Sequence, residues 1–212
     1  MHFRRTLMAA ALASATLLSA CAPLLLGGAA VSGALMVTDR RTSGAQVEDQ
    51  GIELKGESRL RAALGDRAHL NVTSYNRTAL ITGEVANEAD RQLVESTIQG
   101  VENVKAVVNE TAVAGLSSLT SRTNDTIIAS KVKASFVEAK DLQANSIKVV
   151  GERGIIYLMG RVTEREAARA AEVARGVSGV QKVVRVFEIL SEEELKALQP
   201  EPKAKPAQQP AQ

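Results

Sequence analysis

Apolar and polar residues divide the chain into a short apolar start, two similar blocks and a polar end. Residues 7–18 are mostly apolar and follow the basic residues Arg4 and Arg5. A segment of this length is too short to cross a hydrocarbon core of about 30 Å as a helix, and it fits an export signal. At the other end, residues 191–212 become rich in Pro, Gln and Lys, and we expect a disordered tail.

The two blocks repeat one pattern. Residues 80–110 align with residues 157–186, and Gly83 then falls on Gly160. Self-similarity over such a length indicates two copies of one small domain. We expect the two glycines to occupy equivalent places near a strand end, where they serve backbone geometry.

Farther upstream the same comparison is less regular. Residues 70–72 match residues 147–149, whereas residues 60–62 match residues 132–134 with an offset that differs by five. This alignment predicts a longer loop before the first strand of the second copy.

The periodicity within each copy predicts the order helix, strand, strand, helix, strand. In the second copy, Asn124 or Asp125 can cap a helix that ends near Ala139, and Thr163 with Glu166 forms a capping box for the next helix. The predicted strands of this copy are 147–151, 155–159 and 180–189. The first copy has predicted strands at 70–74, 78–83 and 104–113, and a helix at 87–99.

The predicted fold class is therefore α+β, with two tandem αββαβ domains that each contain a small three-stranded mixed sheet and two helices. We place the domains at 52–114 and 125–190 and the connector between them at 115–124. The segment 21–51, apolar at first and polar from residue 38, is interpreted as a stem and linker.

The apolar start ends at Leu18-Ser19-Ala20-Cys21, which contains the only cysteine of the chain. This stretch resembles the lipobox of bacterial lipoproteins, which implies removal of a signal peptide, residues 1–20, and acylation of Cys21, including a palmitate-type chain. Ala22 stands where inner-membrane retention usually has Asp, so the resemblance implies an outer-membrane anchor facing the periplasm. Two or more acyl chains anchor a protein stably. The alternative is an ordinary signal peptide with a chance cysteine.

The composition and the absence of known motifs limit the classes of function that we expect for this chain. Without Arg4 and Arg5, 24 basic residues face 24 acidic ones, so we expect no nucleic-acid partner. His69 is the only histidine left after processing, and HExxH, GxSxG and phosphate-loop motifs are absent. We therefore expect no enzyme, no cofactor and no metal site.

Several stretches of the chain together carry a family resemblance: the lipobox and residues 38–49, 71–75, 124–136, 158–167 and 177–184. On these stretches the repeat is similar to the BON domain, a small αββαβ module of bacterial envelope proteins. The whole chain resembles dual-BON outer-membrane lipoproteins of the DolP type. The resemblance implies a non-enzymatic periplasmic protein that supports outer-membrane integrity, with BON domains that bind phospholipid. The chain departs from the family pattern in its tail after Leu190 and in Ile127, where an aromatic residue would suit a membrane-facing helix.

The two copies differ in charge. Residues 52–113 carry a net charge of −2, and residues 126–190 carry +4. Since each Lys or Arg near an anionic surface contributes about 1 kcal/mol, the second copy is the one predicted to bind anionic phospholipid. The alternative explanation of the charge difference is an ordinary solvated surface. The alternative to lipid binding is a scaffold that docks on a partner such as the outer-membrane protein assembly machinery.

The first helix of the second copy is the predicted lipid site. Its apolar residues Ile128, Val132 and Phe136 recur at helical spacing and should pack on the sheet. An apolar tip inside a basic rim on the other side would suit interfacial docking. The alternative is that Leu119 and Ile127 pack against the first copy. The residues predicted to bind lipid are Leu119, Arg122, Ile127, Ser130, Lys131 and Ala134.

Overall fold

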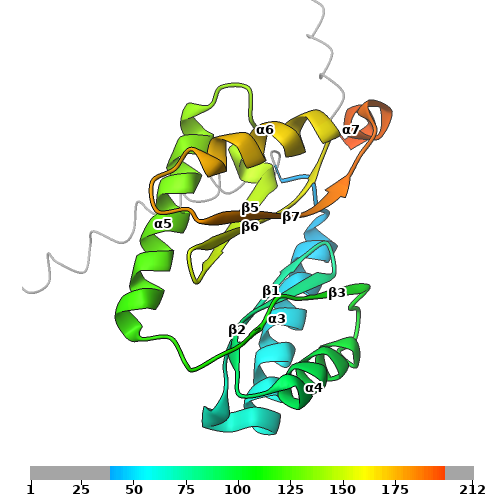
Figure 1. Ribbon diagram of the computed structural model, residues 1–212. Helices are drawn as coiled ribbons and strands as arrows, with labels where there is room; N and C mark the ends of the chain where they lie inside the picture. The colour runs from blue at the N-terminus through cyan, green and yellow to red at the C-terminus, as the bar shows by residue number, and fades with distance from the viewer. Residues whose placement is uncertain (1–38, 199–212) are drawn as a thin grey trace, which may run out of the picture. The chain divides into compact units, whose positions relative to one another are not determined.

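The computed structural model describes residues 39–198, all within one compact unit that begins at Asp39 (Figure 1). The predicted signal peptide, the lipidation at Cys21, the stem up to residue 38 and the tail from residue 199 lie outside the described residues. The unit contains both domains with their hydrophobic cores, so a fragment that begins at Asp39 keeps every contact described below.

The first domain pairs an antiparallel hairpin with a parallel third strand. β1 is antiparallel to β2, and β3 and β4 are both parallel to β2, so these two short strands replace the single third strand predicted from the sequence. Its elements are α3 (Ser43–Leu64), a 3₁₀ turn (Gly65–Arg67), β1 (His69–Tyr75), β2 (Thr78–Val85), α4 (Glu88–Gln99), β3 (Ala106–Asn109) and β4 (Ala112–Val113).

The second domain repeats this arrangement with three strands in the order β5-β6-β7. The predicted capping box is present, because Thr163 Oγ1 accepts from the Glu166 N–H and the Glu166 carboxylate accepts from the Thr163 N–H. Its elements are α5 (Leu119–Glu138), a 3₁₀ turn (Ala144–Ser146), β5 (Ile147–Glu152), β6 (Ile155–Val162), α6 (Glu164–Arg175), β7 (Lys182–Ile189) and α7 (Glu192–Leu198). The predicted α+β class and the two αββαβ repeats are confirmed.

Three predicted irregular segments are wrong in part, because helices extend into them. The predicted linker is helical from Ser43, where Thr42 caps α3 by accepting a hydrogen bond from the Ala45 N–H. The predicted connector is helical from Leu119, where Ser118 is the cap in place of Asn124 or Asp125. The predicted tail contains α7, whose Leu195 is buried.

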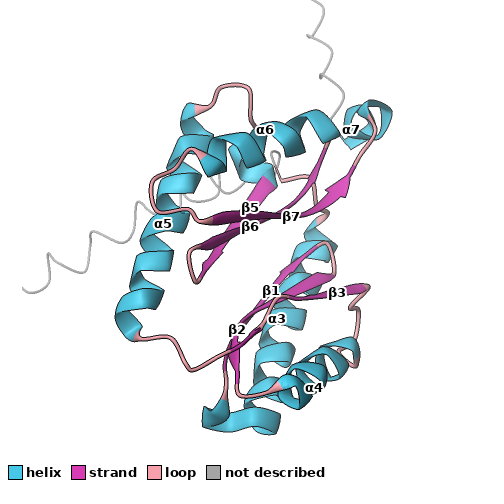
Figure 2. Ribbon diagram, in the orientation of Figure 1, coloured by secondary structure: helices cyan, strands magenta, loops and turns pink. Residues whose placement is uncertain are grey.

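Each sheet has its helices on one face and an apolar core between them (Figure 2). In the second domain α5 contributes Ile128, Val132 and Phe136, as predicted. α6 contributes three alanines, whose small side chains let the helix lie close to the strands. The corresponding core of the first domain consists of Ile52, Leu60, Leu64, Val72, Ala79, Ile81, Val85, Val94, Ile98 and Val101.

The other faces of the two sheets pack against each other. Tyr75 and Leu80 of the first domain form a buried cluster with Tyr157 and Met159 of the second. The Tyr75 hydroxyl also donates to the Ser146 carbonyl oxygen at 3.2 Å. The central strands β2 and β6 are therefore buried on both faces, which explains their nearly continuous apolar sequences.

The structure places Gly83 and Gly160 at equivalent register positions, opposite Leu70 and Ile147 respectively. A Cβ atom at Gly160 would lie 2.5 Å from the Ser146 carbonyl oxygen, and one at Gly83 would collide with the carbonyl of the preceding strand. Gly83 also has a φ of +116°, which side-chain-bearing residues rarely adopt.

A buried aspartate caps the first hairpin turn in each domain. Asp49 of α3 accepts hydrogen bonds from the N–H groups of Asn76 and Arg77. Asp125 of α5 accepts from the N–H groups of Arg153 and Gly154. The helices α3 and α5 are therefore equivalent elements of the two domains, because each supplies the aspartate that binds the hairpin turn. The sequence alignment of residues 60–62 with 132–134 is therefore wrong, but the predicted longer loop is present, since residues 139–146 separate α5 from β5 whereas residues 65–68 separate α3 from β1.

Candidate functional site

All six residues predicted to bind lipid lie on one helix, because α5 begins at Leu119. Ser118 caps this helix by accepting a hydrogen bond from the Ser121 N–H at 3.2 Å. Residues 119–124, which the sequence analysis assigned to the connector, are therefore the first turns of α5, and Leu119 and Arg122 belong to the same helix as the other four residues.

The face of α5 turned away from the sheet is exposed and carries both apolar and polar side chains. Leu119 is 78% exposed and Ile127 is 48% exposed. Ser130, Lys131 and Ala134 are exposed on the same side, whereas Ile128, Val132 and Phe136 are buried on the other. The alternative that Leu119 and Ile127 pack against the first domain is therefore wrong.

One exposed apolar residue of this face was missed from the sequence. Val137 is 68% exposed and follows Ala134 by three residues and Ser130 by seven, which is helical spacing. This spacing could have identified it. We name the set Leu119, Ile127, Ser130, Lys131, Ala134 and Val137 the α5 face.

Arg122 lies apart from the α5 face. Its Nε donates to the Ser117 hydroxyl at 3.0 Å, and that hydroxyl donates to the Glu84 carboxylate at 3.1 Å. Arg122 thus takes part, through Ser117, in the polar contacts between the two domains, and it is only partly exposed.

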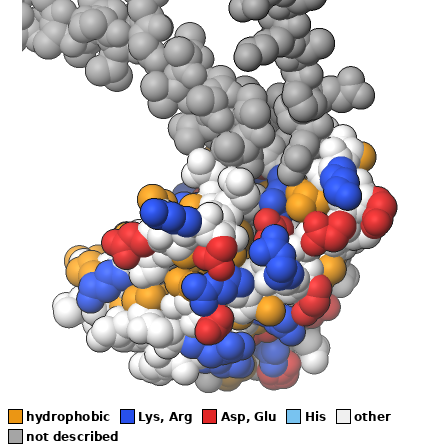
Figure 3. Space-filling model, turned by 90° about the horizontal axis from the view of Figure 1, so that it is seen from above, with side chains coloured by type: hydrophobic (Ala, Val, Ile, Leu, Met, Phe, Trp, Pro, Cys, Tyr) orange, Lys and Arg blue, Asp and Glu red, His pale blue; other side chains and the backbone are white. Residues whose placement is uncertain are grey.

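The basic surplus of the second domain is partly neutralised elsewhere. In Figure 3, basic and acidic side chains are interspersed on the face that is seen from above. Around α6, Arg169 pairs with Asp141 at 2.8 Å and Arg185 with Glu164 at 3.3 Å. Within residues 39–198, by contrast, Lys131 has no carboxylate within ion-pair distance, so the α5 face keeps a free positive charge.

Two buried carboxylates lie where the domains meet. Glu152 of the second domain accepts a hydrogen bond from the Asn71 side-chain amide at 2.9 Å, and Glu84 of the first accepts from Arg153 at 3.2 Å. Burial raises the pKa of Glu152, the hydrogen bond from Asn71 opposes this, and the charge of Glu84 raises the pKa further. His69 Nδ1 lies 3.5 Å from Glu84. The hydrogen bonds of Asn71 with Glu152 and of Arg153 with Glu84 thus connect the two domains.

The described part of the chain contains no cluster of three or more His, Cys, Asp or Glu side chains suited to a metal ion. Across residues 39–198, none of the helices is both long and apolar enough to cross a membrane.

The tandem pair of αββαβ domains defines the class of protein, a two-domain module built from one repeated fold. Both copies match the model of the BON domain, at residues 48–115 and 124–191. The chain belongs to the BON-domain family, and it is a dual-BON, outer-membrane lipoprotein of the DolP type. The resemblance and the localisation predicted from the sequence are thus confirmed.

Two relatives support this assignment. The chain is 33% identical over 185 residues to the outer membrane lipoprotein DolP of Haemophilus influenzae, covering 86% of this chain and 95% of that protein. It is 30% identical over 151 residues to a 21 kDa hemolysin of Actinobacillus pleuropneumoniae, covering 70% and 78%. Among solved structures, the type III secretion protein CdsD of Chlamydia trachomatis covers 70% of this chain at 13% identity and a TM-score of 0.29, too low to carry an argument.

Proposed function

We propose that this lipoprotein is not an enzyme, and that it supports envelope integrity by binding anionic phospholipid at the periplasmic side of the outer membrane through the α5 face. The proposal includes acylation at Cys21, which would hold the domains near the membrane surface. The observation that carries it is the exposure of Leu119, Ile127 and Val137 beside Lys131, which forms no ion pair within residues 39–198.

This combination suits the interfacial region of a bilayer. Apolar side chains gain about 25 cal/mol for each Å² removed from water, and a lysine near an anionic surface adds about 1 kcal/mol. Neither contribution alone would be large for one helix. With the acyl anchor restricting the domains to the surface, a weak face can still be occupied, since the local concentration of lipid is high.

The test uses residues 39–212, which lack the anchor, and co-sedimentation with vesicles. We expect binding to vesicles that contain phosphatidylglycerol and much weaker binding to phosphatidylcholine alone. Ile127→Glu and Lys131→Glu should each reduce binding to the anionic vesicles, because one introduces a charge into the apolar stripe and the other reverses the basic charge.

Leu54→Glu is the matched control. Leu54 is 65% exposed on α3, the equivalent helix of the first domain. The substitution therefore replaces an exposed apolar residue by Glu outside the proposed site, as Ile127→Glu does within it. Circular dichroism checks that each variant is folded. Binding by folded Ile127→Glu and Lys131→Glu at the level of Leu54→Glu would refute the role of the α5 face.

A second candidate is a scaffold that docks on an outer-membrane assembly partner. The observation that favours it is β7, an eight-residue strand that pairs only with β6 among the described strands. An unpaired strand edge can add a strand from a partner. Cross-linking from Arg185 in the middle of β7, compared with cross-linking from Ile127, distinguishes the candidates, since capture of a protein through Arg185 alone would favour the scaffold.

A further inference from the structure

β7 forms the outer edge of the second sheet, in which the strand order is β5-β6-β7. Alternate residues of a strand direct their N–H and C=O groups to opposite edges, so about half of these groups in β7 point away from β6. Among residues 39–198, no strand pairs with that side of β7. The strand spans eight residues with a continuous register, and neither a bulge nor a proline blunts its edge. The free edge of β7 can therefore add another strand.

β7 presents apolar side chains on both faces of its sheet. Val183 and Phe187 pack against the core of the second domain. Val184 and Val186 pack against the cluster between the two domains. All four residues are only partly buried. A strand added at the free edge would cover them on both faces, and this burial would favour its binding.

Each face of the sheet is hollowed at this edge. Toward the first domain, a cavity of about 390 Å³ is lined by Val184 and Val186 together with Val108 of β3. On the opposite face, a cavity of about 170 Å³ lies between Phe187 and Ala167 of α6. Side chains that alternate along an added strand point to the two faces in turn. An extended polypeptide can therefore fill both cavities while it pairs with the backbone of β7.

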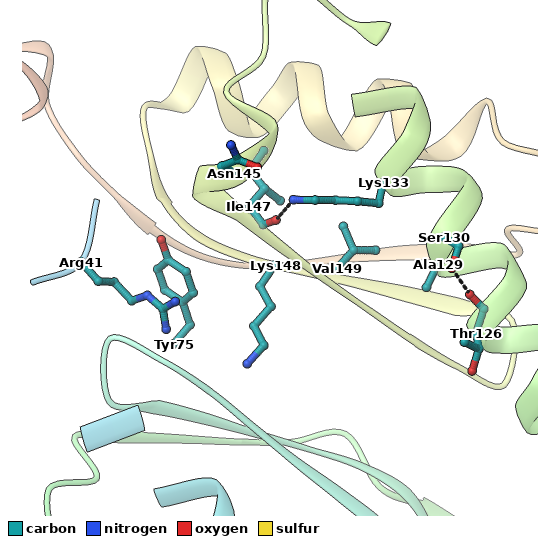
Figure 4. A pocket seen from close by; sticks show the side chains of 10 residues that line it. All are labelled: Arg41, Tyr75, Thr126, Ala129, Ser130, Lys133, Asn145, Ile147, Lys148 and Val149. Carbon is teal, nitrogen blue, oxygen red and sulfur yellow. Dashed lines mark hydrogen bonds between the residues drawn. The ribbon is translucent and has the colours of Figure 1, made fainter. Parts of the chain in front are cut away.

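The larger cavity beside α5 has a different character (Figure 4). Its volume is about 560 Å³, and its lining includes Arg41, Lys133 and Lys148. Arg41 and Lys148 already pair with carboxylates, and Lys133 donates to two backbone carbonyl oxygens. The paired carboxylates belong to Asp39, Asp49 and Glu53. The cations of this cavity are thus satisfied within the protein, unlike the backbone groups at the free edge of β7.

β7 is complementary to a second copy of itself. Two copies of one strand pair antiparallel about a two-fold axis, and this axis must pass through a residue, because an axis between two residues would bring opposite faces of the sheet together. With Arg185 at the axis, apolar residues lie opposite apolar ones and a basic residue lies opposite an acidic one. The pairs, each between one copy and the other, are Lys182 with Glu188, Val183 with Phe187, and Val184 with Val186. By symmetry each of these pairs forms twice.

The neighbouring registers are poorer. Moving the axis by one residue in either direction places Lys182 or Glu188 opposite a valine. The register with Arg185 at the axis brings two guanidinium groups together, but each Arg185 forms an ion pair with Glu164 at 3.3 Å. A carboxylate therefore accompanies each cation, and this register is the favoured one.

The charges needed for the outer pairs are accessible. Lys182 is exposed and forms no ion pair within residues 39–198. Glu188 accepts hydrogen bonds from Arg161 and Asn76, and its side chain is still 43% exposed. A carboxylate accepts from several donors at once, so Glu188 can also pair with Lys182 of a second copy.

We propose that β7 pairs antiparallel with β7 of a second copy of this chain, which joins two three-stranded sheets into one continuous sheet. The inference goes beyond the proposed lipid binding and uses no residue of the α5 face. One strand pair buries little surface, so the dimer is weak in solution. On a membrane, where anchoring raises the local concentration of both copies, the same contact becomes significant.

The first test is sedimentation of residues 39–212 over a range of concentrations. We expect a reversible dimer with a Kd on the order of 100 µM. Lys182→Glu and Glu188→Lys each place like charges opposite one another, so each variant alone should dimerise at least about tenfold more weakly. An equal mixture of the two variants restores both pairs of opposite charges and should dimerise like the unmodified protein.

Lys140→Glu is the matched control. Lys140 is exposed in the loop after α5, so the substitution makes the same change of charge away from β7 and should leave dimerisation unchanged. Circular dichroism checks that each variant is folded. A dimer that Lys182→Glu weakens no more than Lys140→Glu, or that the mixture does not restore, overturns pairing through β7.

Disulfide formation tests the register and covers the case in which Glu188→Lys does not fold. Cys21 is the only cysteine of the chain, so residues 39–212 contain none. Arg185→Cys places two sulfur atoms opposite each other at the axis, and oxidation should give a covalent dimer. Lys182→Cys places them six residues apart along the strand pair, roughly 20 Å, and should give none. Equal yields from the two variants overturn the register.

The remaining outcomes separate this proposal from the others. A sedimentation coefficient that stays at the monomer value up to about ten times the expected Kd overturns the dimer and leaves lipid binding by the α5 face untouched. Cross-linking from Arg185 that gives a product of twice the mass of the chain supports the second copy. Capture of a different protein by a monomeric chain assigns the edge to a heterologous strand and overturns the proposal.

Discussion

Asp125→Ala should destabilise the protein strongly, although Asp125 is far from any expected chemistry. The side chain is 4% exposed, and its two oxygens accept hydrogen bonds from the N–H groups of Arg153 and Gly154 at 2.9 and 2.8 Å. Both turn residues have positive φ angles, +53° and +73°. For Arg153 this conformation is strained. The carboxylate therefore ties α5 to a turn that would not be favoured by itself.

The magnitude follows from these two contacts. A hydrogen bond to a charged group contributes about 1.5–3 kcal/mol, so losing both costs about 3–6 kcal/mol. For a unit of this size that corresponds to a decrease in Tm on the order of 10 °C. Asp125→Asn retains one acceptor oxygen and should lose about half as much.

Asp49 provides an internal comparison. It accepts from the Ser74 hydroxyl and from Arg41 in addition to the two turn N–H groups, so Asp49→Ala should cost more than Asp125→Ala. Asp141→Ala is the control, because among residues 39–198 this exposed carboxylate pairs with Arg169 alone, and its loss should change stability by about 0.5 kcal/mol or less.

The assay is thermal unfolding of residues 39–212, followed by circular dichroism at neutral pH. The expected order of destabilisation is Asp49→Ala, Asp125→Ala, Asp125→Asn, Asp141→Ala. A Tm for Asp125→Ala equal to that of Asp141→Ala would show that these hydrogen bonds do not stabilise the turn and would refute the reasoning.

Three further predictions concern the anchor, a glycine and pH. Cys21→Ala should remove the protein from the outer-membrane fraction, and wild-type fractionation would show that Cys21 is not the anchor. Gly160→Val should cost about 1–3 kcal/mol of stability, because its Cβ would lie 2.5 Å from the Ser146 carbonyl oxygen, whereas Gly115→Val, with no atom within 4 Å, should be neutral in the same thermal melts. Because burial raises the pKa of Glu152, the folded state retains a proton that the unfolded state loses. Stability should therefore fall as pH rises from the ordinary Glu range through that raised pKa, and a denaturant titration should show a flatter profile for Glu152→Gln.

Local signals predicted the second domain better than the first. Thr163 and Glu166 form the capping box that their spacing indicates, and Ile128, Val132 and Phe136 form the predicted stripe. The start of α3 was missed because its buried positions include Asp49 and Gly56, which do not look like core residues. A Cβ at Gly56 would lie 2.9 Å from Ile98 Cδ1, so a larger residue there would make the Ile98 side chain shift. Close packing of this kind is visible only once both elements are in place.

The predicted site shows the same division. Helical spacing indicated which side of α5 would be exposed, and it would also have indicated Val137. Helical spacing could not show where the Arg122 side chain lies. This side chain donates a hydrogen bond to the Ser117 hydroxyl, and that hydroxyl donates one to Glu84 of the other domain. The route of that side chain depends on a residue that is distant in the sequence.

By itself, the sequence determined the repeat, the order of elements in each copy and the exposed face of α5, because period and capping are properties of neighbouring residues. Tertiary structure alone decided that Tyr75 and Leu80 would pack against Tyr157 and Met159, and that Arg41 and Lys133 would line one cavity. Strand alternation shows that a residue faces one side of a sheet, but not what lies on that side. Contacts between segments about a hundred residues apart depend on how two complete domains fit together, and no local pattern contains that information.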